Sequence, residues 1–263
     1  MGRIRNGLVR CARSLARHLL GVARVPTYYL PWLVRPGLTC ALLLSNVEAR
    51  FTTGSQAGPL TLSVRQHDAD GAIVMSREIV LRTPTDAEEV PLEPTPDGAG
   101  FVTVDGKGLR SDLYVTLSDG NGYTATHGRQ EFVELYPLRS RVLFRAAGGA
   151  LALLGLTIPA FTRDQYVYAG ADSRTYVLLM NLSNVTNRIR VTAEDAPTSR
   201  LLPIPPMGAR LLDVAGLIGA PASAATGTRV LRLRLTGNAW FNLYLVGAGA
   251  HGLAGPLSLM HVK

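Results

Sequence analysis

A short apolar segment occurs twice in the chain, and this recurrence constrains the fold more than any other feature. The segment Tyr176–Asn184 reads YVLLMNLSN, and the segment Leu38–Asn46 reads LTCALLLSN. Each is preceded by an aromatic run. Each is followed, in the same order, by an alternating segment with an acidic turn, a short strand ended by proline and a closing strand pair. This shared order predicts an internal duplication.

Both copies have the pattern of antiparallel β-structure. Apolar and polar residues alternate from Leu60 to Gly71, LTLSVRQHDADG, and from Asn187 to Pro197, NRIRVTAEDAP. Glycine and proline mark the turns, and neither copy contains a long segment of helical periodicity. We therefore expect a mainly β protein with two tandem antiparallel β-sandwich domains, preceded by an N-terminal amphipathic helix.

The length and composition of the chain agree with two domains. Its 263 residues are enough for two cores of roughly 100 residues each. Hydrophobic residues make up 47% of the chain and charged residues 17%, which argues against extensive disorder. The expected parts are a basic amphipathic N-terminal helix at 1–24, a first β-sandwich at 25–137, an apolar and partly helical connector at 138–161, and a second β-sandwich at 162–263.

The positive charge is concentrated at the N-terminal end. The net charge is +8, and seven arginines precede the first acidic residue, Glu48. Subtracting these seven from the 27 basic residues leaves 20, which face 19 acidic residues in the rest of the chain. The body is therefore close to neutral, and any attraction to an anionic partner belongs to the arm.

The arm has the periodicity of an amphipathic helix. Its apolar residues recur at spacings of three and four and fall in one stripe: Ile4, Leu8, Cys11, Leu15, Leu19 and Val22. The arginines expected to orient the docked arm are Arg3, Arg10, Arg13 and Arg17. Because such a helix is marginal alone in water, it needs a surface on which to bury its stripe. The candidate surfaces are a larger protein complex, the protein's own body, an anionic membrane and, less favoured, nucleic acid.

The arm does not have the pattern of a secretory signal. Arginines interrupt every apolar run before Val25, so an uninterrupted hydrophobic region of 7–15 residues is missing. The two cysteines, Cys11 and Cys40, suggest no disulfide framework. We expect a cytoplasmic protein that can associate with a membrane, although an Arg-rich, acid-free N-terminus is also typical of organelle import.

A second apolar segment, Ala146–Phe161, contains sixteen uncharged residues between Arg145 and Arg163. It is shorter than the roughly 20 residues that a spanning helix needs, and it contains glycine and proline. The favoured interpretation is a connector packed between the two domains. Shallow membrane insertion beside the arm is the alternative.

The sequence contains no recognisable catalytic motif. The histidines are scattered and form no zinc pattern: His18, His67, His127, His251 and His261. No nucleophile elbow, P-loop or dinucleotide fingerprint occurs. Glu131 and Glu134 are interpreted as solvated charges at a strand edge. We therefore predict no catalytic residues, no cofactor and no metal, and expect that the protein is not an enzyme.

One strand carries aromatic residues on alternating positions. If Phe241, Leu243 and Leu245 face a core, then Trp240 and Tyr244 face solvent. Two exposed rings on a sandwich would form a possible ligand platform, for example for a sugar. The favoured interpretation is nevertheless packing in a core or an interface, and the ligand platform is the alternative.

The strand and turn rhythm of residues 25–263 resembles that of repeated β-sandwich modules in bacterial surface and assembly proteins. This resemblance implies a non-catalytic, structural role. An Arg-rich arm before a β-sandwich is also similar to small viral coat proteins, which implies binding of nucleic acid. We expect an assembly subunit that docks through its arm onto a larger protein complex or an anionic membrane surface, with oligomerisation possible. The alternatives are a coat-like nucleic-acid-binding protein and a carbohydrate-binding module.

Overall fold

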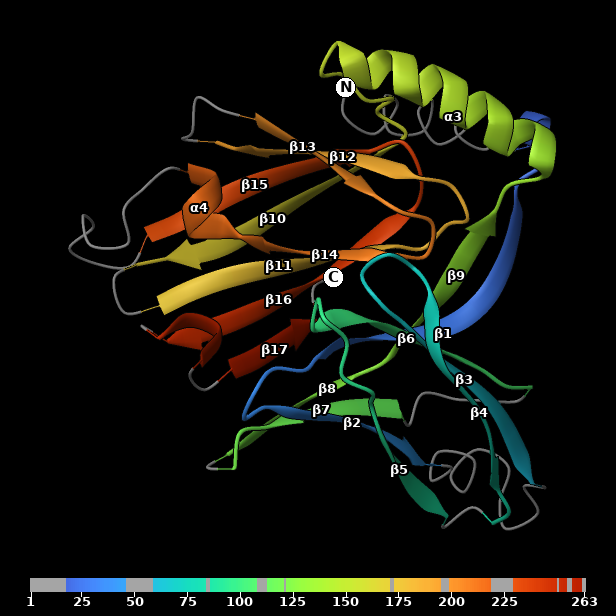
Figure 1. Cartoon of the computed structure of the whole chain (residues 1–263), viewed down its shortest axis with the longest axis vertical. Helices are drawn as coiled ribbons and strands as arrows, with labels where there is room; N and C mark the ends of the chain where they lie inside the picture. The colour runs from blue at the N-terminus through green and yellow to red at the C-terminus, as the bar shows by residue number, and fades with distance from the viewer. Residues whose placement is uncertain are drawn as a thin grey trace, which may run out of the picture.

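The protein is mainly β, as the sequence predicted, with 62% of the described residues in strands. The computed structural model describes residues 18–45, 59–83, 86–107, 113–120, 122–170, 173–194, 199–218, 229–249, 251–254 and 257–261. Within these ranges the strands form four small antiparallel sheets (Figure 1).

The first two sheets come from the N-terminal half. The first has the order β4 (Ile73–Leu81), β3 (Leu60–His67), β6 (Ala99–Asp105), β1 (Ala23–Leu33) and β9 (Arg129–Leu135). The second has the order β5 (Ala87–Pro91), β2 (Thr39–Ser45), β7 (Leu113–Ser118) and β8 (Tyr123–His127).

The other two sheets come from the C-terminal half. The third has the order β10 (Phe161–Ala169), β15 (Arg229–Gly237), β12 (Asn187–Ala193) and β13 (Ser199–Ile204). The fourth has the order β14 (Ala209–Asp213), β11 (Ser173–Asn181), β16 (Phe241–Gly249) and β17 (Leu257–His261). The described helices are α3 (Leu138–Leu153), the short α4 (Val214–Ile218) and the 3₁₀ turn η2 (Gly252–Ala254).

The prediction of two tandem β-sandwich domains was wrong, because the four sheets are arranged as the blades of a four-bladed β-propeller. In a sandwich, each sheet commonly keeps one face in water. Here, every residue from Phe241 to Val246 of β16 is buried, so both faces of the fourth sheet are covered. On β11, Tyr176 and Leu178 join a core shared with the first two sheets, whereas Val177 and Leu179 pack against the third. The two halves therefore do not form separate packing units.

The connectivity within the sheets nevertheless follows one scheme in both halves. The order β4-β3-β6-β1 of the first sheet matches β13-β12-β15-β10 of the third, and β5-β2-β7-β8 of the second matches β14-β11-β16-β17 of the fourth. The two similar sequence segments form β2 and β11, which hold the same place in these orders. Strand β9, paired with β1, extends the first sheet beyond this scheme.

Helix α3 lies across one end of the molecule, over β12 and β13 (Figure 1). It begins after Pro137, in the segment expected to be a partly helical connector. Its inner side packs on a small cluster of buried residues that includes Tyr136 and Val185, and the ring of Phe144 lies 4.8 Å from that of Tyr136.

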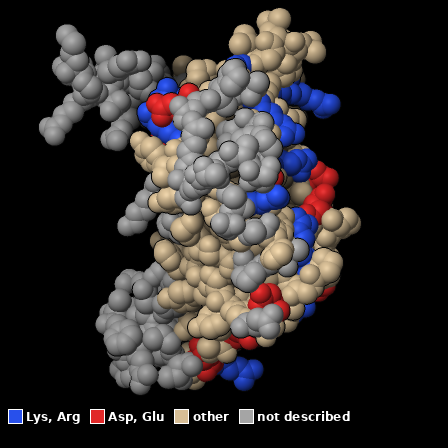
Figure 2. All heavy atoms as spheres, turned by 90° about the vertical axis from the view of Figure 1, so that its left-hand side faces the viewer, with Lys and Arg blue, Asp and Glu red and all other residues tan. Residues whose placement is uncertain are grey.

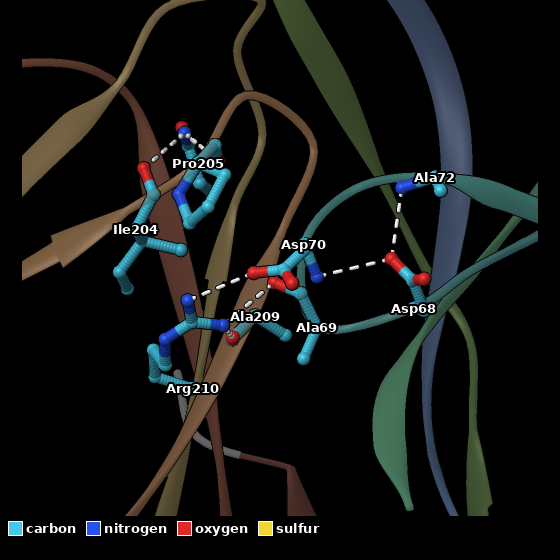
Figure 3. A network of polar contacts seen from close by, with 9 residues as sticks. Asp68, Ala69, Asp70, Ala72, Ile204, Pro205, Ala209 and Arg210 are labelled. Carbon is cyan, nitrogen blue, oxygen red and sulfur yellow. Dashed lines mark hydrogen bonds and ion pairs between the residues drawn. The ribbon is translucent and has the colours of Figure 1, made fainter. Parts of the chain in front are cut away.

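The two halves meet where the β3–β4 turn reaches β14 (Figure 3). The carbonyl oxygen of Ala69 accepts hydrogen bonds from the Ala209 N–H and the Arg210 guanidinium, both at 2.9 Å. The same guanidinium pairs with Asp70 at 3.0 Å. Asp68 shapes the turn by accepting the N–H groups of Asp70 and Ala72. The turn therefore contacts the second half through backbone as well as side-chain groups.

Gly71 closes this turn with a φ of +85°, and a Cβ atom there would overlap the carbonyl oxygen of Pro206. We predict that Gly71→Ala lowers the free energy of unfolding through both backbone strain and this overlap. Gly120 has the same φ of +85°, but a Cβ atom there would meet nothing within 4 Å. Gly120→Ala is therefore the matched control for strain alone, at about 1–3 kcal/mol. Denaturant unfolding should show about 1–3 kcal/mol of additional loss for Gly71→Ala. Equal losses would mean that the halves do not touch closely at this turn.

Candidate functional site

The structure describes only part of the predicted arm. Ile4, Leu8, Cys11 and Leu15 of the stripe lie outside the described residues, as do Arg3, Arg10, Arg13 and Arg17. Residues 18–20 are helical and β1 begins at Ala23, so the chain is already in a strand before the predicted boundary at 24. The side chain of Leu19 is exposed, whereas Val22 packs beside Phe144 in the cluster under α3. The end of the predicted stripe is thus divided between solvent and the protein's own body.

Trp240 and Tyr244 pack within the protein, in agreement with the favoured interpretation of core or interface packing, because both faces of the fourth sheet are covered. Tyr244 is fully buried, and its hydroxyl donates a hydrogen bond to the His127 carbonyl at 3.3 Å. Trp240 is half-buried, with the Phe132 ring 4.8 Å and the Phe161 ring 5.2 Å from its own. These residues therefore lack the exposed rings of a ligand platform.

A buried polar cluster beside them was not anticipated. Asn242 donates through its amide to the Tyr29 hydroxyl and, at 3.3 Å, to Glu131, which also pairs with Arg129 at 2.5 Å. Burial raises the pKa of the Glu131 carboxyl and the pKa of the Tyr29 hydroxyl, and it lowers the pKa of the Arg163 guanidinium. The cluster joins β1 and β9 of the first sheet to β16 of the fourth. Its polar groups are directed at one another, so it ties the halves together.

The interpretation of Glu131 and Glu134 as solvated edge charges was wrong. The side chain of Glu134 is fully buried, and it pairs with Arg24 at 3.2 Å and accepts the Tyr136 hydroxyl at 3.0 Å. Strand β9 is the edge strand of the first sheet, but the second half covers it, since the backbone of Glu134 is hydrogen-bonded to Leu182 and Asn184. A pattern of residues close together in the sequence could not predict burial by a segment that is distant in the sequence.

A groove of about 410 Å³ lies where the halves meet, beside the turn drawn in Figure 3. Its charged residues are of both signs: Arg35, Asp70, Asp97, Arg210 and Asp213. Most of these groups already have partners within the protein, since Arg35 donates to the Asp97 carbonyl and Arg210 binds Asp70. Among the described residues, no three metal-ligating side chains come together. The groove therefore offers little free chemistry for a ligand.

The outer face of α3 presents a different kind of surface. Ser140, Phe144 and Gly148, spaced by four residues, face the protein. The opposite face is apolar yet open to solvent: the exposed fraction is 68% for Leu138, 91% for Leu153 and 73% for Leu154. The exposed large apolar residues on and just after the helix are Leu138, Val142, Leu143, Leu153, Leu154 and Leu156. Exposed apolar residues gathered on and beside one helix are a candidate docking surface.

The charged residues of α3 itself are all positive. The exposed Arg139, Arg141 and Arg145 lie on α3, and no acidic residue occurs between Glu134 and Asp164 in the sequence. Figure 2 shows an uncharged surface at the top of the molecule, where the C-terminal end of α3 lies, with basic side chains below it. The face thus combines apolar side chains with arginines.

The fold also brings the end of the arm to this helix. Ala23 at the start of β1 pairs with Leu135 at the end of β9, so the chain before β1 and the chain after β9 leave the sheet at the same place. The Ser140 hydroxyl then donates to the Leu20 carbonyl at 2.6 Å. Two acid-free, Arg-bearing segments that are distant in the sequence therefore meet at one end of the molecule.

Comparison with known proteins assigns no family to the chain. No protein-family model matches it, and no curated protein shows significant similarity to it. Among the described residues, no helix has both the length and the apolar character needed to cross a membrane.

One buried histidine makes the stability depend on pH. His67 is buried, lies 3.3 Å from the Thr103 hydroxyl through Nε2 and stacks on Phe101. Burial lowers the pKa of its imidazole below the ordinary value of 6.5. The unfolded chain therefore binds a proton near pH 6 that the folded chain does not, and stability is lost as the pH falls below 6.5.

We predict that His67→Gln reduces this acid-side loss by up to about 1 kcal/mol per pH unit. The measurement is the free energy of unfolding from neutral to mildly acidic pH. The exposed His251 supplies the control, because His251→Gln should keep the pH dependence of the unaltered protein. An unchanged slope in His67→Gln would show that the folded protein accepts a proton at His67 without cost.

Proposed function

We propose that the protein is a non-catalytic structural or assembly subunit that docks on an anionic membrane surface through the outer face of α3. The exposed apolar face of this helix, whose only charged residues are arginines, is the observation that supports the proposal. The arm, with its Arg3, Arg10, Arg13 and Arg17, is the second attachment. The body of four sheets is the part that the docked helix holds at the surface.

The geometry of α3 suits a helix that lies in the plane of the interface. At 1.5 Å per residue, its 16 residues span about 24 Å. Fully burying one leucine-sized side chain contributes about 1.5–3 kcal/mol, and each arginine near anionic lipids adds about 1 kcal/mol. Several partly inserted leucines and three arginines therefore give reversible attachment, which a second segment strengthens.

Charge favours a membrane over a protein as the occupant of this face. The arginines lie on α3 and in the arm, where no acidic residue balances them. A surface of many anionic headgroups can pair with all of these arginines at once. It also accommodates inserted leucines wherever they lie along the helix. A protein partner would need an acidic rim matched to each arginine. The larger protein complex predicted from the sequence remains the alternative outcome of the experiment.

We predict that Val142→Glu combined with Leu153→Glu weakens binding to phosphatidylserine-containing vesicles at least about tenfold, because two inserted apolar groups are lost. Vesicle co-sedimentation measures the effect, with phosphatidylcholine vesicles as the reference. Ile73→Glu combined with Val80→Glu is the matched control, since both residues are exposed on β4, away from α3. Unchanged binding by the α3 variant would contradict the proposal. Stable co-elution with another protein, without vesicle binding, would identify the larger complex as the occupant.

Deleting residues 1–17 should weaken vesicle binding without abolishing it and should flatten its dependence on salt. The arm supplies five arginines in this range, whereas the apolar face of α3 stays in place. Co-sedimentation at increasing salt concentration distinguishes the two attachments. Complete loss of binding on deletion would place the whole attachment in the arm.

A further inference from the structure

A small pocket of about 210 Å³ lies between α3 and the segment that enters β12. Three of its lining residues are arginines: Arg141 and Arg145 from α3 and Arg188 from β12. The pocket is also lined by Phe144, Asn184 and Thr186. The volume is below the range of roughly 300–1,000 Å³ typical of drug-sized ligands, so a ligand that fits it is small.

The wall of the pocket is held by contacts within the protein. Asn184 is fixed by two hydrogen bonds to the backbone of Tyr136, at 2.7 and 3.1 Å. The backbone of Arg188 donates to Asn238 and accepts from the Thr157 hydroxyl at 2.6 Å. Gly148 lets the Arg188 guanidinium approach the helix, since a Cβ atom there would lie 2.8 Å from Arg188 Nη1. The site is therefore already formed before any ligand binds.

The pocket arginines differ from others in the protein. Arg24, Arg65 and Arg129 each have a carboxylate within ion-pair distance. Among the described residues, no carboxylate lies within that distance of Arg141, Arg145 or Arg188. Three neighbouring guanidinium groups repel one another, and a bound anion would relieve that repulsion.

We propose that this pocket binds a phosphomonoester group. Guanidinium groups form paired hydrogen bonds with phosphate oxygens, and a dianion with three free oxygens can use all three arginines. A phosphodiester offers fewer free oxygens and one charge. Arg141 and Arg145 lie on the flank of α3 between its apolar face and the protein, so the pocket is at headgroup level when the helix lies on a membrane. The lipid form of the ligand therefore rests on the proposed membrane docking, whereas a soluble phosphomonoester does not.

The test uses the full chain and glycerol phosphate, titrated calorimetrically against it. Arg188→Gln and Arg141→Gln should each lower the affinity about tenfold or more, since each removes a charge-assisted contact. Two variants are used so that a folding defect in one does not decide the result. Arg139→Gln is the matched control, because Arg139 is exposed on the same helix but does not line the pocket. Absence of binding by the unaltered protein, or equal losses in all three variants, would overturn the proposal.

A second measurement identifies the source of the phosphate. Vesicles containing phosphatidic acid, a phosphomonoester, are compared with phosphatidylglycerol vesicles of matched surface charge. A preference for phosphatidic acid that Arg188→Gln abolishes supports the lipid source. Binding of glycerol phosphate without that preference supports a soluble ligand. Vesicle binding that needs α3 but shows neither preference nor glycerol phosphate binding would overturn this inference while leaving the proposed docking intact. Binding of glycerol phosphate without any vesicle binding would overturn the proposed docking while leaving the phosphomonoester pocket intact.

Discussion

The burial of the fourth sheet on both faces is the constraint on which the rest of the structure depends. Strands β11 and β16 carry apolar residues at successive positions, and each position has a core on its own side. Neither half could expose this sheet to water without uncovering a row of large side chains. The halves are therefore combined in one packed body.

The polar residues at the junction follow from this packing. Where two halves bury a common surface, the polar groups inside it must find partners across it. The amide of Asn242 reaches Tyr29 and Glu131, and Arg210 reaches the Ala69 carbonyl. The chemistry that resembles a site in isolation, a carboxyl with a raised pKa beside a tyrosine, is thus explained by the joining of the halves. A functional surface is therefore expected where charged groups are not used in this way.

The sequence predicted what depends on near neighbours in the chain. Alternation from Asn187 to Ala193 indicated a strand, and the similar segments at Leu38 and Tyr176 formed strands in the same place of their sheets. It did not predict which sheets share a core. An apolar residue of β16 gives the same sequence pattern whether it packs on the second sheet of a sandwich or on another blade. The burial of Glu134 was missed for the same reason. For the candidate site, the basic, acid-free segments could be recognised, but not their contact or the approach of Arg188 to α3.

That contact arises from strand β9. Because β9 pairs antiparallel with β1, the end of one strand lies beside the beginning of the other, and the segments attached there must leave the sheet together. Both segments are rich in leucine and arginine and contain no acidic residue, so neither neutralises the other. The body below supplies carboxylates to many of its own arginines but none within ion-pair distance of those described in the pocket under α3. The arginines gathered by the topology have no carboxylate partner among the described residues, which favours an anionic partner, and the leucines beside them favour one that is also apolar.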